Sequence, residues 1–529
     1  MSPARFGIDR VFERRLAGLV NSGEPQIIQG GRKGVEKESL RVLPTGVIAQ
    51  TPHPRALGSA LTSEHITTDF SESLIELVTP AFTTSWELLQ YLLDLHQFVY
   101  QHIGDELLWA TSMPCAIEGD AQIPIAQYGS SNVGRMKMIY REGLSRRYGR
   151  MMQAISGVHY NYSFPQRFWE AYAAVADTRA SGQALISSGY FDLLRNYRRY
   201  GWIVLYLFGV SPVICKSFLK GRDDSLPQLT PGTLYEPYAT SLRMSDMGYR
   251  NRNQAGVSIS VNSLEEYVRD LGRAISTPHP PYQALGVRVD GHYRQLNANL
   301  LQIENEYYSF IRPKRVARSG ERPTKALRRA GVEYVEVRAL DVSAFDPVGV
   351  NQHKMRFLEA FLALCLLKAS PPIEAAEQDA LDQNHLLVAR RGREPGLELQ
   401  REGRPVPMTG WAEELLDCMV GICELLDRGD PAQPYAQALA TQSAKVRDVR
   451  LTPSARLLEE LRSTGESFFE LALRMSATHK AYFLDLYTPN PERLAEFATE
   501  AQQSLEQQRA LEAAEQEPFE QYLARYFAD

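Results

Sequence analysis

The chain has 529 residues, of which 44% are hydrophobic and 23% charged, a balance typical of a globular protein with a sizeable core. The formal net charge of −5 argues against a nucleic-acid-binding protein, because such proteins usually carry a clustered basic excess. The N-terminus lacks the apolar core of a signal peptide, and the apolar runs at 202–208 and 357–367 are too short to span a bilayer, so we expect a cytoplasmic protein without a membrane partner.

The first part of the chain alternates helical and strand-like segments. Apolar spacing predicts an amphipathic helix over 8–22, and a glycine-rich stretch then leads into a strand over 35–42. We expect a turn at 44–46, a return strand at 47–50, an extended run that ends at 80, a helix over 85–103 and a further strand over 157–164.

The rest of the chain changes from mixed to helical character. We expect mainly helix over 168–221, a short strand and a helix over 254–272, a hairpin over 285–304 around Asp290–Gly291, and a last strand over 332–341. Helices follow at 355–367, 410–426, 455–473 and 491–527, the last of them solvated. The fold class is therefore α+β, with a mostly antiparallel sheet. We expect a catalytic α+β region over 1–351 and a helical region over 352–529, either as two parts or as one continuous domain.

Alternation along the strand-like segments gathers acidic and polar side chains on single faces. Glu36 and Glu38 share one face of their segment, and Glu336 and Arg338 share one face of another. His159 lies on the polar face of a third segment. If these segments pair in one sheet, one face packs on helices and the other becomes an acidic basin. Several carboxylates share a basin only if cations neutralise them or some stay protonated.

The carboxylates in or beside these segments are Glu36, Glu38, Asp69, Glu76 and Glu336. Hard oxygen ligands of this kind suit Mg²⁺ or Mn²⁺ rather than zinc. Chemistry at such a basin is usually phosphoryl transfer, in which metal ions bridge phosphate oxygens and an arginine offsets the growing charge. We therefore expect a divalent-metal nucleotide site on an antiparallel sheet.

The roles of His159 and Arg338 depend on whether the carboxylates form one acidic basin. His159 is either a core histidine held by a hydrogen bond or a ligand of the metal or phosphate. Arg338, two residues from Glu336 and on its face, has the position expected of the arginine that offsets charge on the transferred group.

Other nucleotide and hydrolase motifs are not supported. The stretch 129–136 has the spacing of a phosphate-binding loop, but Arg135 replaces the required lysine and Met136 the metal-binding hydroxyl. No GxGxxG follows a strand and no GxSxG occurs, which argues against a dinucleotide fold and a nucleophile elbow.

The five cysteines are dispersed and form no CxxC pair, so a structural zinc module is not expected. Their odd number in a long chain favours a reducing compartment. Cys418 and Cys423 are candidates for a regulatory disulfide by proximity in the sequence alone.

Taken together, these segments resemble the glutamate–cysteine ligase family of gamma-proteobacteria. The matching strings lie at 36–42, 56–62, 66–70, 126–129, 138–144, 155–161, 302–306 and 333–338, with a weaker one at 454–458. Residues 370–450 and 465–529 lie outside the resemblance.

The resemblance implies a fold like that of glutamine synthetase, a curved sheet that forms a funnel. It also implies ATP-dependent joining of the L-glutamate γ-carboxylate to the amine of L-cysteine, the first step of glutathione synthesis, with Mg²⁺ or Mn²⁺, by a monomer or weak oligomer. The alternatives are a ligase of the same fold that uses another amine, and a non-catalytic regulator that binds metal or nucleotide.

The resemblance assigns residues as well. The metal and ATP-phosphate set is Glu36, Glu38, Asp69, Glu76, His159 and Glu336. Arg338 matches the arginine that faces the γ-phosphate, and with Glu336 and His159 it makes up the catalytic set; His159 and Arg338 also contact the nucleotide. The amino-acid pocket matches Phe70, Tyr140, Leu144, Gln153, Arg243, Tyr249 and Tyr308. Arg243 could hold the α-carboxylate of either substrate.

Overall fold

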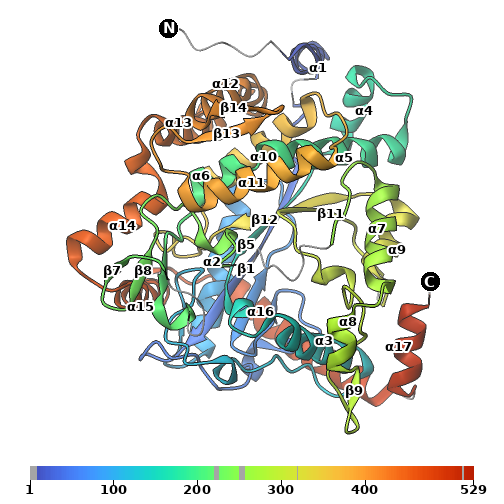
Figure 1. Ribbon diagram of the computed structural model, residues 1–529, viewed down its shortest axis with the longest axis vertical. Helices are drawn as coiled ribbons and strands as arrows, with labels where there is room; N and C mark the ends of the chain where they lie inside the picture. Colours follow the sequence, from blue (N-terminus) through green and yellow to red (C-terminus); the bar gives the residue numbers. More distant parts are fainter. Residues whose placement is uncertain are drawn as a thin grey trace.

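The computed structural model describes residues 9–24, 26–219, 225–248, 257–318, 320–514 and 517–528. Within them, a seven-stranded sheet has the order β11-β12-β5-β1-β3-β2, and β4 pairs with β1 off that path (Figure 1). Its strands are β1 (Arg32–Val42), β2 (Ile66–Thr68), β3 (Leu74–Val78), β4 (Leu107–Leu108), β5 (Val158–Ser163), β11 (Ile311–Lys314) and β12 (Tyr334–Leu340). All of its strand pairs are antiparallel, which confirms the α+β class and the mostly antiparallel sheet.

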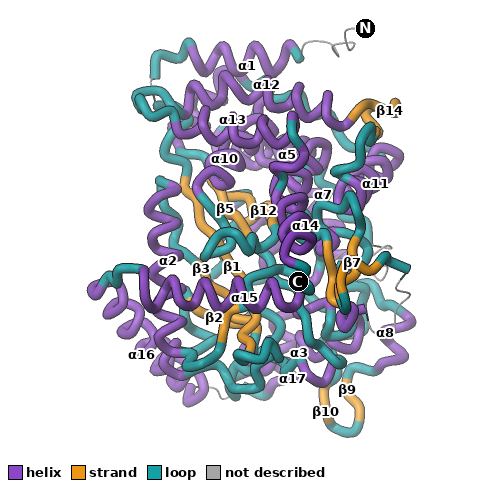
Figure 2. Tube along the Cα trace, turned by 90° about the vertical axis from the view of Figure 1, so that its left-hand side faces the viewer, coloured by secondary structure: helices purple, strands orange, loops and turns teal. Residues whose placement is uncertain are grey.

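Helices surround the sheet. They are α1 (Arg10–Val20), α2 (Ser85–His102), α3 (Asn132–Tyr148), α4 (Gln166–Val175), α5 (Gly182–Tyr200), α6 (Trp202–Phe208), α7 (Leu264–Ser276), α8 (Pro280–Leu285), α9 (Pro323–Ala330), α10 (Gln352–Leu367), α11 (Ala375–Arg391), α12 (Met408–Leu426), α13 (Pro434–Arg447), α14 (Pro453–Thr464), α15 (Phe468–Ala481), α16 (Pro491–Ala514) and α17 (Phe519–Phe527). Helices α10, α12 and α13 lie at one end of the molecule, and α3, α16 and α17 lie at the other (Figures 1 and 2).

The described residues also form three smaller sheets. They are formed by β6 (Val213–Cys215), β7 (Gln228–Thr230) and β8 (Thr233–Tyr235), by β9 (Arg288–Val289) and β10 (His292–Tyr293), and by β13 (Glu398–Arg401) and β14 (Arg404–Pro407). None of the described helices combines the length and apolar character needed to cross a membrane.

The register of the central sheet sorts side chains by face. Val35 lies opposite Tyr160, and Val335 lies opposite Tyr162, and all four are buried. Helix α2 packs on β1 and β3, α5 on β11 and α6 on β12, while α10 packs on α2 and α5. This apolar face leaves the opposite face of the same strands for polar side chains. Helix α10 is the first helix of the expected C-terminal region, and it packs on α2 and α5 of the expected N-terminal region. The division of the chain into two regions at residue 351 therefore stays a prediction.

Two of the C-terminal helices expected from the sequence are each divided in two. The helix expected over 455–473 is α14 and α15, because Gly465 ends α14 in the left-handed conformation with φ of 73°. The helix expected over 491–527 is α16 and α17, and α17 begins after Pro518. The expectation of a solvated helix was wrong in part, because Phe497 of α16 is buried and α16 packs on α2.

Some expected strands also differ. The return strand at 47–50 is reduced to one isolated bridge at Ile48. The hairpin around Asp290–Gly291 is confirmed, and both turn residues have positive φ, 51° and 81°. Of the strand and helix expected over 254–272, the described residues contain the helix, α7.

The cysteines pair differently from the prediction. A disulfide joins Cys115 to Cys215 of β6, 100 residues apart in the sequence. Cys418 and Cys423 are both free on α12, so the pair suggested by proximity was wrong. Residues five apart on a helix project in different directions, whereas the fold brings two distant segments together. The Cys115–Cys215 disulfide was not predicted, because the cysteine count had favoured a reducing compartment.

Candidate active site

The acidic residues converge on the face of the sheet opposite the helices. Glu36 of β1 lies across from His159 of β5, and Glu38 of β1 lies across from Glu76 of β3. Glu336 comes from β12, the strand on the other side of β5. Directly opposed residues of an antiparallel pair project to the same side, so the register places these five side chains together.

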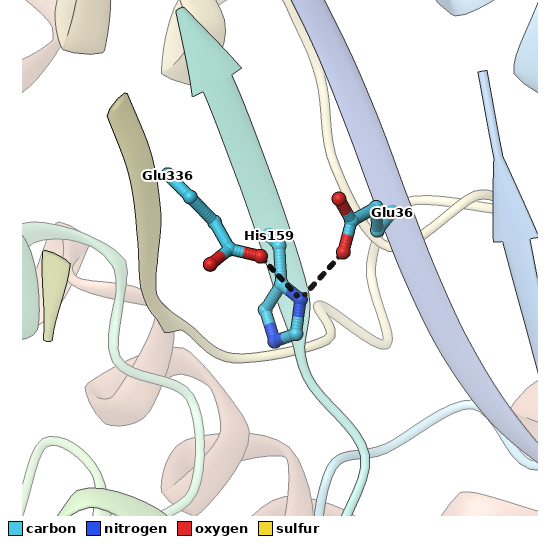
Figure 3. A group of neighbouring side chains, drawn as sticks. All are labelled: Glu36, His159 and Glu336. Carbon is cyan, nitrogen blue, oxygen red and sulfur yellow. Dashed lines mark hydrogen bonds and ion pairs between the residues drawn. The ribbon is translucent and has the colours of Figure 1, made fainter. Parts of the chain in front are cut away.

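His159 stands between the carboxylates. Its Nδ1 lies 3.1 Å from Oε2 of Glu36 and 3.7 Å from Oε1 of Glu336 (Figure 3). Its Nε2 lies 3.7 Å from Oε1 of Glu38. Two groups of candidate metal ligands therefore share the imidazole: one is Glu36, His159 and Glu336, and the other is Glu38, Glu76 and His159, with the ligand atoms of each group within 4.8 Å of one another.

Carboxylate oxygens at this spacing fit a hard divalent cation such as Mg²⁺ or Mn²⁺. Asp69, which the sequence placed in the same set, belongs to neither group. Its backbone carbonyl accepts hydrogen bonds from the Tyr128 hydroxyl, at 3.0 Å, and from the Arg141 guanidinium. Its charge nevertheless acts on Glu38 and Glu76, so the side chain lies near the site.

Crowding raises the pKa of two of the carboxyl groups. Burial raises the pKa of Glu38 to about 7, and the charge of Asp69 adds to that effect. Burial and the neighbouring charge of Glu36 raise the pKa of Glu76 well above its usual value. Protonation of these two groups is favoured because too few positive charges face them, and a bound cation would favour their ionised form instead.

The other two carboxyl groups are held in the ionised form. Lys314 and Arg338 outweigh the effect of burial on Glu336 and keep its pKa well below the usual value. Burial and Glu336 oppose ionisation of Glu36, but the hydrogen bond and charge of His159 outweigh them and lower its pKa. The site therefore separates into a part near β12 whose carboxyl groups have lowered pKa values and a part near β3 whose carboxyl groups have raised pKa values.

Three cations line the edge of the site formed by β11 and β12. Nη1 of Arg338 donates to Oε1 of Glu336 at 3.2 Å, and Nζ of Lys314 lies 3.5 Å from the same oxygen. Arg312 is buried and lies across from Glu336 in the register. The sequence assigned Arg338 to the site but assigned neither cation of β11 to it. Their only signal was the alternation of basic residues around Pro313, and a proline argues against a strand.

Two residues matched to the amino-acid pocket lie beside Arg338. Arg243 is 1% exposed, and its Nη2 donates to the backbone carbonyl of Arg338 at 3.2 Å. The Tyr308 hydroxyl donates to Sδ of Met244 at 3.2 Å. Burial raises the pKa of Tyr308, and the charges of Arg243 and Arg338 act against that rise. A buried guanidinium of this kind is suited to a carboxylate of a substrate.

The other matched residues come from separate segments. Phe70 follows β2, and Leu144 of α3 is buried in the same apolar cluster, with Tyr140 of α3 packed against it. Gln153 is half-buried in the short turn before β5. Tyr249 lies outside the described residues. Phe70 and Leu144 thus belong to one apolar cluster, with Tyr140 at its margin, and their place in an amino-acid pocket stays a prediction.

Comparison with known proteins gives consistent matches. The family model for glutamate–cysteine ligase matches residues 16–388. Glutamate–cysteine ligases of Alcanivorax borkumensis and of Pseudomonas putida strain W619 are 50% identical over 528 residues and 48% identical over 518; each alignment covers 98% of this chain, and 99% and 98% of the relatives. The crystal structure of glutamate–cysteine ligase from Francisella tularensis in complex with AMP has a TM-score of 0.88 and 37% identity, and the match covers 94% of this chain and 98% of that one.

Proposed function

The chain belongs to the glutamate–cysteine ligase family, and on this premise we propose that its acidic basin performs the ATP-dependent ligation of L-glutamate to L-cysteine. The γ-carboxylate of glutamate is joined to the amine of cysteine through γ-glutamyl phosphate, with release of ADP and phosphate. The observation that carries the proposal is the convergence of four glutamates and one histidine from four strands on one face of the sheet.

The first step activates a poor electrophile. An oxygen of the γ-carboxylate attacks the γ-phosphorus of ATP, the bond to the bridging oxygen breaks, and ADP leaves. Bound Mg²⁺ supplies Lewis-acid stabilisation of the phosphate oxygens, and the two groups of carboxylates around His159 would hold it. The guanidinium of Arg338, next to Glu336, offsets the charge that grows on the transferred group.

The second step forms the amide. The cysteine amine attacks the carbonyl carbon of γ-glutamyl phosphate, phosphate leaves with the bonding electron pair, and the nitrogen passes its proton to a carboxylate of the basin. Arg243 holds the α-carboxylate of one substrate as a buried cation. The apolar wall of Phe70, Tyr140 and Leu144 favours the thiol of cysteine over the hydroxyl of serine, because a hydroxyl would lose its hydrogen bonds with water there.

We also propose that the enzyme works in the cytoplasm, where ATP and free amino acids are available, and as a monomer or weak oligomer. The second proposal is supported by the fact that one chain supplies both groups of candidate ligands and Arg338.

Mass spectrometry of the products tests the function directly. The purified chain with ATP, Mg²⁺, L-glutamate and L-cysteine should form γ-glutamylcysteine, with one ADP released for each dipeptide. Mixtures that lack one amino acid serve as controls. Faster ADP release with a different amine would identify another ligase on the same fold, and ADP release without any coupled product would contradict ligation.

A further inference from the structure

The face that carries the acidic residues continues past Glu36 to an end that the reaction steps above do not use. In β1 and β5 this end holds Gly34 opposite Asn161. In β11 and β12 it holds Lys314 opposite Tyr334. A glycine, an amide, an ammonium and a phenol therefore share this end of the site face. Gly34 and Asn161 lie in the same cross-strand row as Glu336, and Lys314 and Tyr334 lie one row beyond it.

The amino-acid pocket lies at the other end. The backbone N–H of Gly157 donates to Oε2 of Glu38 at 2.6 Å, and a Cβ on Gly157 would lie 2.1 Å from Nη2 of Arg243. Arg243 is thus packed against the Glu38 end of the site. In phosphoryl transfer the attacking and leaving oxygens lie roughly in line on opposite sides of phosphorus. With the acceptor carboxylate at the Glu38 end, the leaving ADP must extend toward the Gly34 end.

We propose that Lys314 binds the β-phosphate of the nucleotide and so sets the direction of ATP along the strands. Its Nζ lies 3.5 Å from Oε1 of Glu336, the oxygen that Arg338 contacts at 3.2 Å. The Lys314 side chain is 34% exposed, whereas that of Glu336 is 1% exposed, so Lys314 lies where the site opens to a ligand. An ammonium on a flexible stem is a common phosphate-binding group.

Unpaired polar atoms mark the same path. Oε2 of Glu336 and Oδ1 of Asn161 are buried and have no hydrogen-bond partner among the described residues. Nδ2 of Asn161 donates to Oε1 of Glu36 at 2.9 Å, which holds the amide against the acidic groups. A buried oxygen without a partner is costly. We infer that a metal ion binds Oε2 of Glu336 and that a hydrogen-bond donor of the nucleoside binds Oδ1 of Asn161.

The position of the Lys314 ammonium is the reason for assigning it to the β-phosphate rather than to the γ-phosphate or the nucleoside. Arg338 lies where the γ-phosphate is transferred, and Tyr334, four residues earlier in β12, lies at the nucleoside end. Lys314 starts from the row of Tyr334, but its Nζ reaches back to the row of Glu336. The ammonium therefore lies between the two ends of the nucleotide, where the phosphate that stays on ADP must pass.

This inference rests on the proposed function and is tested by calorimetric titration of the full chain with ADP and with AMP in the presence of Mg²⁺. Lys314→Met should raise the Kd for ADP by about tenfold or more, because a hydrogen bond to a charged group is lost. It should leave the Kd for AMP within about twofold, because AMP has no β-phosphate. Lys314→Arg keeps the charge and should recover most of the ADP affinity.

Lys325→Met of α9 is the matched control. It removes an ammonium that hydrogen-bonds the backbone carbonyl of Ala528, away from the central sheet, and should change neither Kd. Equal weakening of ADP and AMP by Lys314→Met would overturn the assignment to the β-phosphate. Unchanged ADP affinity would overturn any role in nucleotide binding. A wild-type chain that neither binds ADP nor forms it from ATP would instead refute the proposed function, and this inference with it.

Discussion

Strand β1 carries a buried ion pair on one face and a group of unbalanced buried carboxyl groups on the other. On the helix-covered face, Nζ of Lys33 lies 2.6 Å from Oε2 of Glu359 in α10, and both side chains are 1% exposed. The hydroxyls of Tyr162 and Tyr435 donate to the same carboxylate at 3.2 Å and 2.8 Å. The two charges of this pair are balanced and hydrogen-bonded, as a buried ion pair requires.

The site face of the same strand is left unbalanced. Glu36 and Glu38 meet Glu76 and Glu336 around one histidine, and two of the four carboxyl groups have raised pKa values. A core needs every charge matched within the chain, whereas a site leaves charges to be matched by its ligands. Removing one carboxylate should therefore cost stability on one face and activity on the other.

The largest effect is expected on the helix-covered face. Glu359→Gln should lower the free energy of unfolding by about 3–5 kcal/mol, because the ammonium of Lys33 loses its counter-charge in the core. Urea unfolding measures the loss, and the folded fraction should keep its specific activity. The double variant Lys33→Met/Glu359→Leu should regain most of the stability. A double variant as unstable as the single one would show that the ion pair is not the cause.

A glutamate-to-glutamine change on the site face should lower kcat rather than stability. Glu76→Gln should lower kcat by on the order of 10²–10³, because a charged metal ligand is lost. The stability of the metal-free protein should stay unchanged or rise slightly, since glutamine resembles the protonated carboxyl group that burial favours. ADP formation and thermal unfolding with a chelator measure the two quantities. The control is Glu64→Gln, because Glu64 is exposed. If Glu76→Gln turned over as fast as the wild type, Glu76 would not be a metal ligand.

Alternation along a strand is local, and for this reason the sequence predicted which side chains share a face. Glu36, Glu38 and Glu336 were placed on polar faces from their own segments alone. The register that sets Glu36 against His159, and Glu38 against Glu76, depends on contacts between distant segments and could not be predicted.

The residues missed by the sequence lie where local signals disagree with the fold. Strand β11 has four residues and contains Pro313, which argues against a strand, so Lys314 was not assigned to the site. The strand forms because it lies at the edge of the sheet, where a missing N–H is tolerated. Lys33 and Glu359 are 326 residues apart, and the disulfide partners are 100 apart. Pairing at such distances needs the tertiary structure.

Acid should stabilise the metal-free protein through Glu38. Burial raises the pKa of Glu38 from 4.5 to about 7, so between these values the folded chain holds a proton that the unfolded chain releases. This contribution to stability is fully present below pH 4.5 and is lost as the pH rises to about 7, with a size of up to about 3 kcal/mol.

Thermal unfolding with a chelator at the two ends of this pH range measures the effect. Mg²⁺ binds the ionised carboxylates, so it should raise Tm more at the upper end of the range than at the lower end. Glu38→Gln should reduce the pH dependence in this range, and the raised pKa of Glu76 accounts for part of what remains. If this variant keeps the wild-type slope, another group is responsible for it.

The smallest effect is expected from a single hydroxyl that contacts the buried ion pair. Tyr435→Phe removes the hydrogen bond of 2.8 Å to Oε2 of Glu359, but Lys33 and Tyr162 still contact that carboxylate. The loss should be about 1 kcal/mol in the free energy of unfolding, with kcat unchanged. Because a charge remains paired after a neutral donor is lost, this loss should be well below that of Glu359→Gln. Equal losses from the two variants, measured by urea unfolding, would mean that the hydroxyl rather than the ion pair stabilises this face.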